Sequence, residues 1–169
     1  MDSPTLYSRR RDGLASPIIP IFIQSADRCI HRGKTVQIVV FIGTIVEKFK
    51  ASPCLIVVPN STITNWVREF DRWAPHIRVV PYHGEAKARG IIRRYELFHD
   101  NVKKGTTSAK YHVLITTYDM LSNQKEFGSV FNSAPRWETL VVDEGQRCER
   151  KCTFVIIWAH YFILFSEER

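Results

Sequence analysis

Two short polar motifs, each beside an apolar segment, carry the side chains that nucleotide hydrolysis requires. Gly33-Lys34-Thr35 opens the apolar run TVQIVVFIGTIVEKF, and Asp143-Glu144 follows the apolar run TLVV. At the start of a helix the first motif offers backbone N–H groups and a lysine to phosphates, and the Thr35 hydroxyl to Mg²⁺. Asp143 would hold the same Mg²⁺, and Glu144 would orient or deprotonate the attacking water. The motifs predict a nucleoside triphosphate and magnesium site with Asp143 and Glu144 as catalytic residues.

The segments around these motifs alternate between strand-like and helix-like patterns. Apolar runs rich in β-branched residues predict strands at 54–59, 77–84, 111–118 and 137–145, and 21–27 could supply a strand ahead of the phosphate motif. Helical spacing predicts helices at 35–49, 63–73, 85–102 and 119–127. The alternation predicts an α/β fold, a parallel sheet with helices on both faces, in which ligands bind at the carboxyl ends of the strands.

Periodicity also predicts which side chains of two helices face the core. In the first helix the apolar positions are Val36, Val39, Val40, Gly43 and Val46. In the second they are Ile63, Trp66, Val67, Phe70 and Trp73. Aromatic residues can also stack on nucleic-acid bases. The helical spacing of the aromatic residues here favours a place in the core.

The composition is that of an ordinary soluble domain with an excess of positive charge. Of 169 residues 44% are hydrophobic, and 24 Lys and Arg face 17 Asp and Glu, a net charge of +7. This balance suits a polyanion such as nucleic acid. Part of the charge falls on the helix expected at 85–102, as Lys87, Arg89, Arg93 and Arg94. A solvated helix face explains that cluster equally well.

The two ends of the chain depart from the alternating pattern. Residues 1–17 carry arginines, serines and prolines and are expected to form a disordered basic lead-in. Residues 151–169 form an atypical apolar tail, whose stretch 153–165 is shorter than the roughly 20 residues of a membrane-spanning helix. We therefore expect the folded unit at residues 18–150 and no association with membranes.

Five segments between Gly33 and Arg147 carry a more specific pattern. They read GKTVQIVVFIGTIV, CLIVVPNSTITNWVREFDRWAP, VVPYHGEAKARGIIRRYE, YHVLITTYDML and WETLVVDEGQR. In order and spacing they resemble the first RecA-like lobe of Swi/Snf-type helicase-like ATPases, above all the chromodomain-helicase (CHD) type of chromatin remodeller. The resemblance implies an incomplete RecA-like P-loop lobe that uses ATP and Mg²⁺, belongs to a DNA translocase acting on nucleosomes, and works in the nucleus.

The resemblance also assigns roles residue by residue. Gly33, Lys34 and Thr35 would contact phosphates and Mg²⁺, Asp143 the metal and Glu144 the water. Two further segments match those that follow the DNA backbone in the family, and they comprise Pro59, Asn60, Ser61, Thr116, Thr117 and Tyr118. Hydroxyl and backbone N–H groups at strand ends are suited to phosphate contacts, which agrees with this assignment.

The chain departs from the family pattern on both sides of the resemblance. Before Gly33 the family usually has aspartate, glutamate, methionine, glycine and leucine, whereas this chain has Arg28-Cys29-Ile30-His31-Arg32. His31 replaces the glycine, and its side chain would obstruct a tight phosphate loop. Gln146 replaces the usual histidine. The later motifs of the lobe and the second RecA-like lobe are absent from this sequence, and with them the arginine fingers worth roughly 10³ to 10⁵ in rate.

These departures leave several hypotheses open. The chain could be a fragment or misprocessed product of a longer ATPase, with little activity by itself. It could be a remnant that has lost nucleotide binding and keeps DNA or protein contacts. It could also fold poorly, because a sheet without its outer strands has unpaired edges. An RNA helicase of the DEAD type is disfavoured, because the acidic motif continues Asp-Glu-Gly-Gln.

Overall fold

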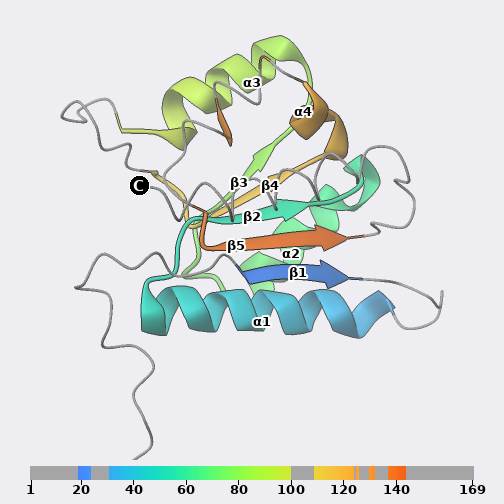
Figure 1. Ribbon diagram of the computed structural model, residues 1–169, viewed down its shortest axis with the longest axis vertical. Coiled ribbons are helices and arrows are strands. Elements are labelled where there is room, and N and C mark those ends of the chain that lie inside the picture. Colours follow the sequence, from blue (N-terminus) through green and yellow to red (C-terminus); the bar gives the residue numbers. More distant parts are fainter. Residues whose placement is uncertain are drawn as a thin grey trace, which may run out of the picture.

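A parallel sheet forms the centre of the chain. The computed structural model describes residues 19–23, 31–99, 109–123, 125, 130–131 and 137–143. Within them lie the strands β1 (Ile19–Ile23), β2 (Cys54–Val57), β3 (Val79–Tyr82), β4 (Val113–Thr116) and β5 (Thr139–Asp143). They form one sheet in the order β1-β5-β2-β4-β3, and every pairing is parallel (Figure 1). The α/β fold with a parallel sheet is confirmed.

Helices cover both faces of this sheet, as the alternation predicts. The longer ones are α1 (His31–Phe49), α2 (Ile63–Trp73) and α3 (Ala86–Ile92), and the shorter turns are η2 (Asn60–Thr62), η3 (Arg93–Leu97) and α4 (Tyr118–Ser122). In Figure 1, α1 lies on one side of the sheet and α3 and α4 lie on the other. Alternate residues of β2 point to opposite faces, and all four are buried, which explains why this strand is a continuous apolar run.

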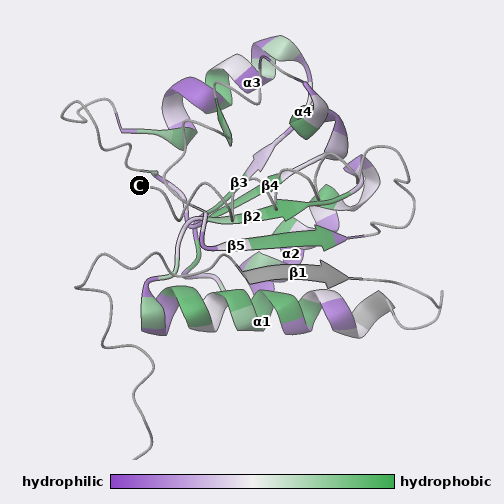
Figure 2. Cartoon of the chain, in the orientation of Figure 1, coloured by the Kyte–Doolittle hydropathy of each residue, from purple (hydrophilic) through white to green (hydrophobic). Residues whose placement is uncertain are grey.

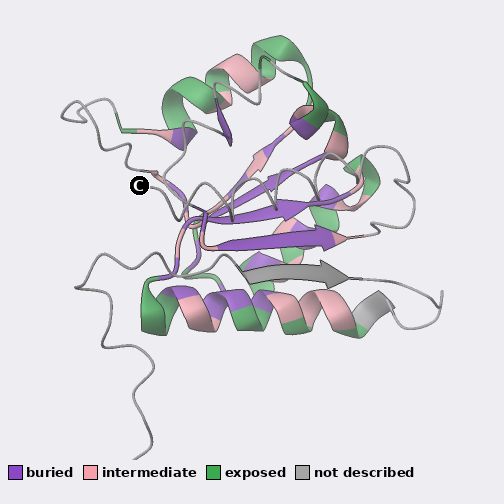
Figure 3. Ribbon diagram, in the orientation of Figure 1, coloured by how far each residue is buried: buried purple, intermediate pink, exposed green. Residues whose placement is uncertain are grey.

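Each face has its own core. The α1 face, covered by α1 and α2, is built from Val39, Ile42, Val46, Cys54, Ile56, Val58, Ile63, Trp66, Phe70, Ala74, Ile77, Val113, Ile115 and Val141. The α3 face, covered by η3 and α4, is built from Leu55, Val57, Val80, Tyr82, Leu97, Tyr111, Leu114, Leu121, Val130, Phe131, Trp137, Leu140 and Val142. Figure 3 shows β2, β4 and most of β5 as buried, whereas residues of β3 alternate between intermediate and buried.

The first helix begins four residues earlier than its apolar pattern predicts, at His31, and its buried face is rotated. Val39, Gly43 and Val46 are buried as expected, but Val40 is 46% exposed, and Ile42 takes the place in the core. The prediction for Val40 is wrong because the face toward the sheet runs through 39, 42, 43 and 46, the i, i+3, i+4, i+7 spacing. A Cβ on Gly43 would stand 3.2 Å from the Ala74 Cβ, so glycine permits the close approach of α1 to the end of α2.

The second helix has the predicted bounds, but the predicted burial of one of its side chains is wrong. Trp66 and Phe70 are buried as expected, but Trp73 is 47% exposed. Its indole donates a hydrogen bond of 2.9 Å to Glu69, one turn earlier. Trp73 is the last residue of the helix, and the small Ala74 that follows fills the core position instead. The prediction of a buried Trp73 is therefore wrong.

The third helix is shorter than its basic, amphipathic pattern predicts. α3 continues into η3, which ends at Leu97 rather than at 102. Leu97 is fully buried in the α3 face, and Phe98 is extended and pairs with Ala109 in an antiparallel bridge. The helix ends here because the main chain turns to pair with the segment before β4.

Figure 2 shows β2 and β5 as mainly hydrophobic and the described helices as a mixture of hydrophobic and hydrophilic residues. Among the described residues, no helix combines the length and the hydropathy of a membrane span. Residues 1–17 and 151–169, with the apolar stretch 153–165, lie outside the described part of the chain.

Candidate functional site

The carboxyl ends of the strands bring the predicted site segments to one edge of the sheet. In the strand register Ile23 of β1 stands beside Asp143 of β5, and Val57 of β2 stands between Val142 and Thr116. All strands are parallel, so the chain leaves β1, β2, β4 and β5 on the same side. Figure 1 shows the first turn of α1 on that side too, near the arrowheads of β1 and β5.

The phosphate motif lies in the first turns of α1. The first N–H groups of an α-helix have no acceptor within the helix, and in α1 these include that of Gly33. The first turn has no acidic residue, so its positive dipole end is not offset there. Gly33 is exposed, and a Cβ built on it would meet no atom within 4 Å. Lys34 and Thr35 are half-buried. This helix end is suited to an anion.

Asp143 is anchored through both its side chain and its main chain. It ends β5 and is half-buried. The indole Nε1–H of Trp66 donates to Asp143 Oδ2 at 3.2 Å, and the Tyr118 hydroxyl donates to the Asp143 carbonyl. Helical spacing predicts Trp66 only as a core residue. A signal for the contact was nevertheless present, since a buried tryptophan usually finds a partner for its N–H.

The donor set at this edge fits a magnesium ion held together with phosphates. A threonine hydroxyl and an aspartate carboxylate are hard oxygen ligands, and Mg²⁺ is commonly held by one or two carboxylates plus substrate phosphates. Thr35, in the first turns of α1, and Asp143, at the end of β5, would supply these oxygens. Glu144, the predicted partner of the water, lies outside the described residues.

The two segments predicted to follow DNA lie side by side, but their side chains differ in exposure. The Val58 N–H donates to the Thr116 carbonyl at 2.9 Å, which joins the chain after β2 to the end of β4. Asn60 and Ser61 are exposed in η2. Thr116 is fully buried, and its hydroxyl donates to the Tyr82 carbonyl at 2.9 Å. Thr117 is buried and precedes α4. Only Asn60 and Ser61 of these predicted contacts present exposed side chains.

The predicted basic helix remains largely exposed. Lys87, Arg93 and Arg94 are exposed, and the Arg94 guanidinium lies 5.5 Å from the centre of the exposed Tyr95 ring. Arg89 is half-buried and donates to the Gly84 carbonyl. The first residues of α3 follow β3 at the carboxyl edge. The basic side chains of α3 therefore start at the carboxyl edge of the sheet, where the other candidate site residues lie.

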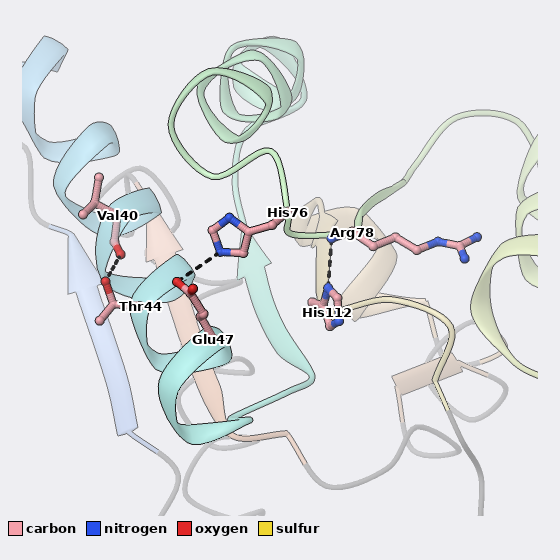
Figure 4. Close-up of polar contacts among 6 residues, drawn as sticks. All are labelled: Val40, Thr44, Glu47, His76, Arg78 and His112. Atoms are coloured by element: carbon pink, nitrogen blue, oxygen red, sulfur yellow. Dashed lines mark hydrogen bonds and ion pairs between the residues drawn. The ribbon is translucent and has the colours of Figure 1, made fainter.

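The opposite edge of the sheet has a different polar cluster (Figure 4). Arg78 donates its backbone N–H to Nδ1 of His112 at 2.9 Å and its guanidinium to Glu96 at 2.7 Å. His76 lies 3.9 Å from Glu47. Burial lowers the pKa of His112, and the nearby positive charges of His76, Arg78 and Lys50 lower it further. These contacts join the segment before β3 to the segment before β4, to η3 and to α1.

Comparison with known proteins gives a consistent result. The sequence model of the SNF2-related domain matches residues 32–156. Protein CHROMATIN REMODELING 4 of Arabidopsis thaliana is 48% identical over 120 residues, which cover 68% of this chain and 5% of that protein. The CHD3-type chromatin-remodeling factor CHR7 of the same plant is 39% identical over 119 residues, 70% of this chain and 9% of that protein. The chain therefore spans less than a tenth of these relatives.

The fold has a solved counterpart. The SWI2/SNF2 ATPase core of Sulfolobus solfataricus, determined in complex with dsDNA, superposes with a TM-score of 0.55 and 21% identity, over 87% of this chain and 25% of that chain. At this identity the likeness concerns the fold. The resemblance to Swi/Snf-type ATPases of the CHD kind is confirmed by the matched domain and the relatives. The chain belongs to the SNF2-related domain family.

Proposed function

We propose that residues 18–150 act as the nucleotide-binding part of the first RecA-like lobe of an ATP-dependent DNA translocase, a nuclear chromatin remodeller. One observation carries the proposal: the first turn of α1, with Lys34, and the metal-binding candidate Asp143 lie at the same edge of a parallel sheet. Membership of the SNF2-related domain family and the CHD-type relatives support it.

Each residue of this edge has a distinct task in the proposal. The N–H group of Gly33 and the Lys34 ammonium bind the ATP phosphates. Thr35 and Asp143 hold Mg²⁺, which when bound neutralises charge on the phosphate oxygens. Glu144 orients the water that attacks the terminal phosphate. Hydrolysis also needs a second RecA-like lobe to supply positive charge to the transition state.

The DNA-facing part of the proposal rests on the neighbouring segments. Exposed Asn60 and Ser61 contact the phosphate backbone of nucleosomal DNA directly, and Thr117 contributes from the start of α4. Thr116 acts indirectly, because its buried hydroxyl ties the end of β4 to β3. The exposed arginines and lysine of α3 and η3 add attraction for the same polyanion.

A second candidate function is a DNA- or protein-binding module that has lost nucleotide binding. The observation in its favour is the start of α1, where His31 is already helical at the position of a family glycine. Helical backbone there leaves less freedom for a phosphate-cradling turn than glycine would provide. The experiment below separates the two candidates.

The test is a thermal melt of the chain with and without millimolar Mg-ATP. A ligand at 100 times its Kd stabilises the folded state by roughly 2.7 kcal/mol. We expect Mg-ATP to raise the melting temperature of the wild type and of Lys48→Ala, which removes an exposed lysine from the other end of α1. Lys34→Ala should not respond. A cooperative melt that ATP leaves unchanged in all three would favour the binding module.

A further inference from the structure

Asp143 and Trp66 form a contact between the proposed magnesium site and the core of the α1 face. The two residues come from β5 and α2, and the bond runs from Nε1 to Oδ2 over 3.2 Å. Trp66 is 1% exposed and belongs to the same core cluster as Phe70 and Ile63. Close packing leaves a large buried ring little freedom. The direction of its N–H is therefore fixed by the core.

A fixed donor orients the acceptor that it binds. An indole has a single N–H and no acceptor, so it engages one carboxylate oxygen in one direction. The bond holds Oδ2 of Asp143 against the core and sets the plane of the carboxylate. The main chain at the same residue is held as well, because the Tyr118 hydroxyl donates to the Asp143 carbonyl. Both the position and the rotation of this carboxylate are thus determined by the surrounding protein.

We propose that Trp66 is a positioning residue that orients the Asp143 carboxylate for Mg²⁺. The proposal rests on the function proposed above and adds a residue to which neither the sequence motifs nor the matched family segments assign such a role. Metal-binding carboxylates are themselves commonly hydrogen-bonded, and loss of such a partner typically costs about 10- to 100-fold in metal affinity. Trp66 would therefore act on the metal through Asp143, without touching it.

The α3 face supplies a matched control. Trp137 is also 1% exposed, and its Nε1–H donates to the Phe131 carbonyl at 3.1 Å. Trp66→Phe and Trp137→Phe each remove one buried indole hydrogen bond and keep an aromatic ring in the core. Similar losses of thermal stability are expected. Only Trp66→Phe is expected to alter magnesium dependence.

The first readout measures the contact without nucleotide or metal. In the ¹H–¹⁵N spectrum of the full chain, Asp143→Ala should shift the Trp66 indole N–H signal and speed its hydrogen exchange. The Trp137 indole signal should stay in place. This arm needs no substitution of Trp66, so it remains informative even where Trp66→Phe folds poorly. An unmoved Trp66 signal would overturn the proposal.

The second readout is the magnesium dependence of binding of a fluorescent ADP analogue. We expect Trp66→Phe to need about tenfold more Mg²⁺ for half-maximal binding than the wild type, and Trp137→Phe to match the wild type. Binding in EDTA should be equal in all three. Equal magnesium dependence of the two variants would refute the positioning role.

The two proposals fail in different ways. A wild-type chain that binds no nucleotide at any magnesium concentration refutes the proposed function and, with it, the role of Trp66 toward a metal. A wild type that binds with normal magnesium dependence, beside a Trp66→Phe variant that does the same, refutes the positioning role alone.

Discussion

The two faces of the sheet are built from the same strands yet differ in composition and covering. The α1 face is mainly aliphatic and is covered by two long helices. The α3 face is richer in aromatic residues, with Tyr82 against Phe131 at 6.1 Å and Tyr111 against Trp137 at 6.2 Å between ring centres. Its covering elements are shorter. A mainly aliphatic core and a more aromatic core can therefore both bury a face of this sheet.

The faces differ more in what they contribute to the candidate site. From the α1 face come the first turn of α1 and the indole that binds Asp143. The corresponding indole of the α3 face, Trp137, is satisfied by a main-chain carbonyl within its own core. The comparison indicates that the α1 face contributes the contact with the Asp143 side chain, whereas the α3 face, through Tyr118, holds the Asp143 main chain.

The largest effect is expected from truncating the core of the α1 face. Phe70→Ala should reduce the free energy of unfolding by about 3–5 kcal/mol, because a buried ring is lost and a cavity remains. Trp73→Ala, three residues away on an exposed surface, should cost only about 1 kcal/mol through its contacts with Glu69 and Arg72. Denaturant unfolding measures both. Equal losses would contradict the assignment of Phe70 to the core and Trp73 to the surface.

A smaller, pH-dependent effect is expected at the edge of the sheet where the strands begin, in the polar cluster that contains Arg78 and His112. The pKa of His112 is lowered in the folded state, so folding favours its neutral form. The stability that neutral His112 contributes is complete above the unfolded pKa of about 6.5 and is lost as the pH falls through the lower folded pKa. Protonation would abolish the acceptor for the Arg78 N–H and add charge beside Arg78 and Lys50.

His112→Asn tests this expectation, because an amide oxygen can replace Nδ1 as an acceptor and does not titrate. We expect the variant to lose less stability than the wild type between pH 7.5 and 5.5, by about 1 kcal/mol or less, the worth of one hydrogen bond. His99→Asn, at an exposed position, serves as the control for general loss of a histidine. An unchanged pH dependence in His112→Asn would rule out His112 as its source.

The smallest effect is expected in the aromatic core of the α3 face. The Tyr111 hydroxyl is buried and has no hydrogen-bond partner among the described residues, and burial raises its pKa. An unpaired buried hydroxyl costs free energy, so Tyr111→Phe should leave stability unchanged or raise it by about 1 kcal/mol. Denaturant unfolding measures the difference. A clear loss of stability would indicate a partner for this hydroxyl and would make the α3 face more polar than the comparison assumes.

Much of the fold was predictable because strong local patterns and tertiary packing agree. The runs around Ile56 and Ile115 are apolar without interruption, and both proved to be central strands buried on two faces. The errors arise where geometry beyond the local pattern decides. Val40 has the spacing of an apolar helix face, but the part of α1 that contacts the sheet is narrower than this face and leaves Val40 exposed. Trp73 is the last residue of α2 and lies beyond the part of this helix that packs against the core.

The candidate site was predictable to a similar degree. The motifs around Lys34 and Asp143 were identified from residue types beside apolar segments, and the structure brings the corresponding element ends to one edge of the sheet. Their roles toward ATP, Mg²⁺ and DNA remain predictions. The buried state of Thr116 was not predictable, because a threonine at a strand end has a similar local pattern whether its hydroxyl faces solvent or the neighbouring strand.

The amino-acid sequence is sufficient to predict the order of strands and helices along the chain, the two polar motifs and the family. These depend on residue type and local spacing, which remain visible in a linear chain. The hydrogen bond from Trp66 to Asp143, 77 residues further along, depends on the three-dimensional fold. The order of strands in the sheet and the rotation of α2 bring these residues together, and neither can be read from the local pattern of either segment.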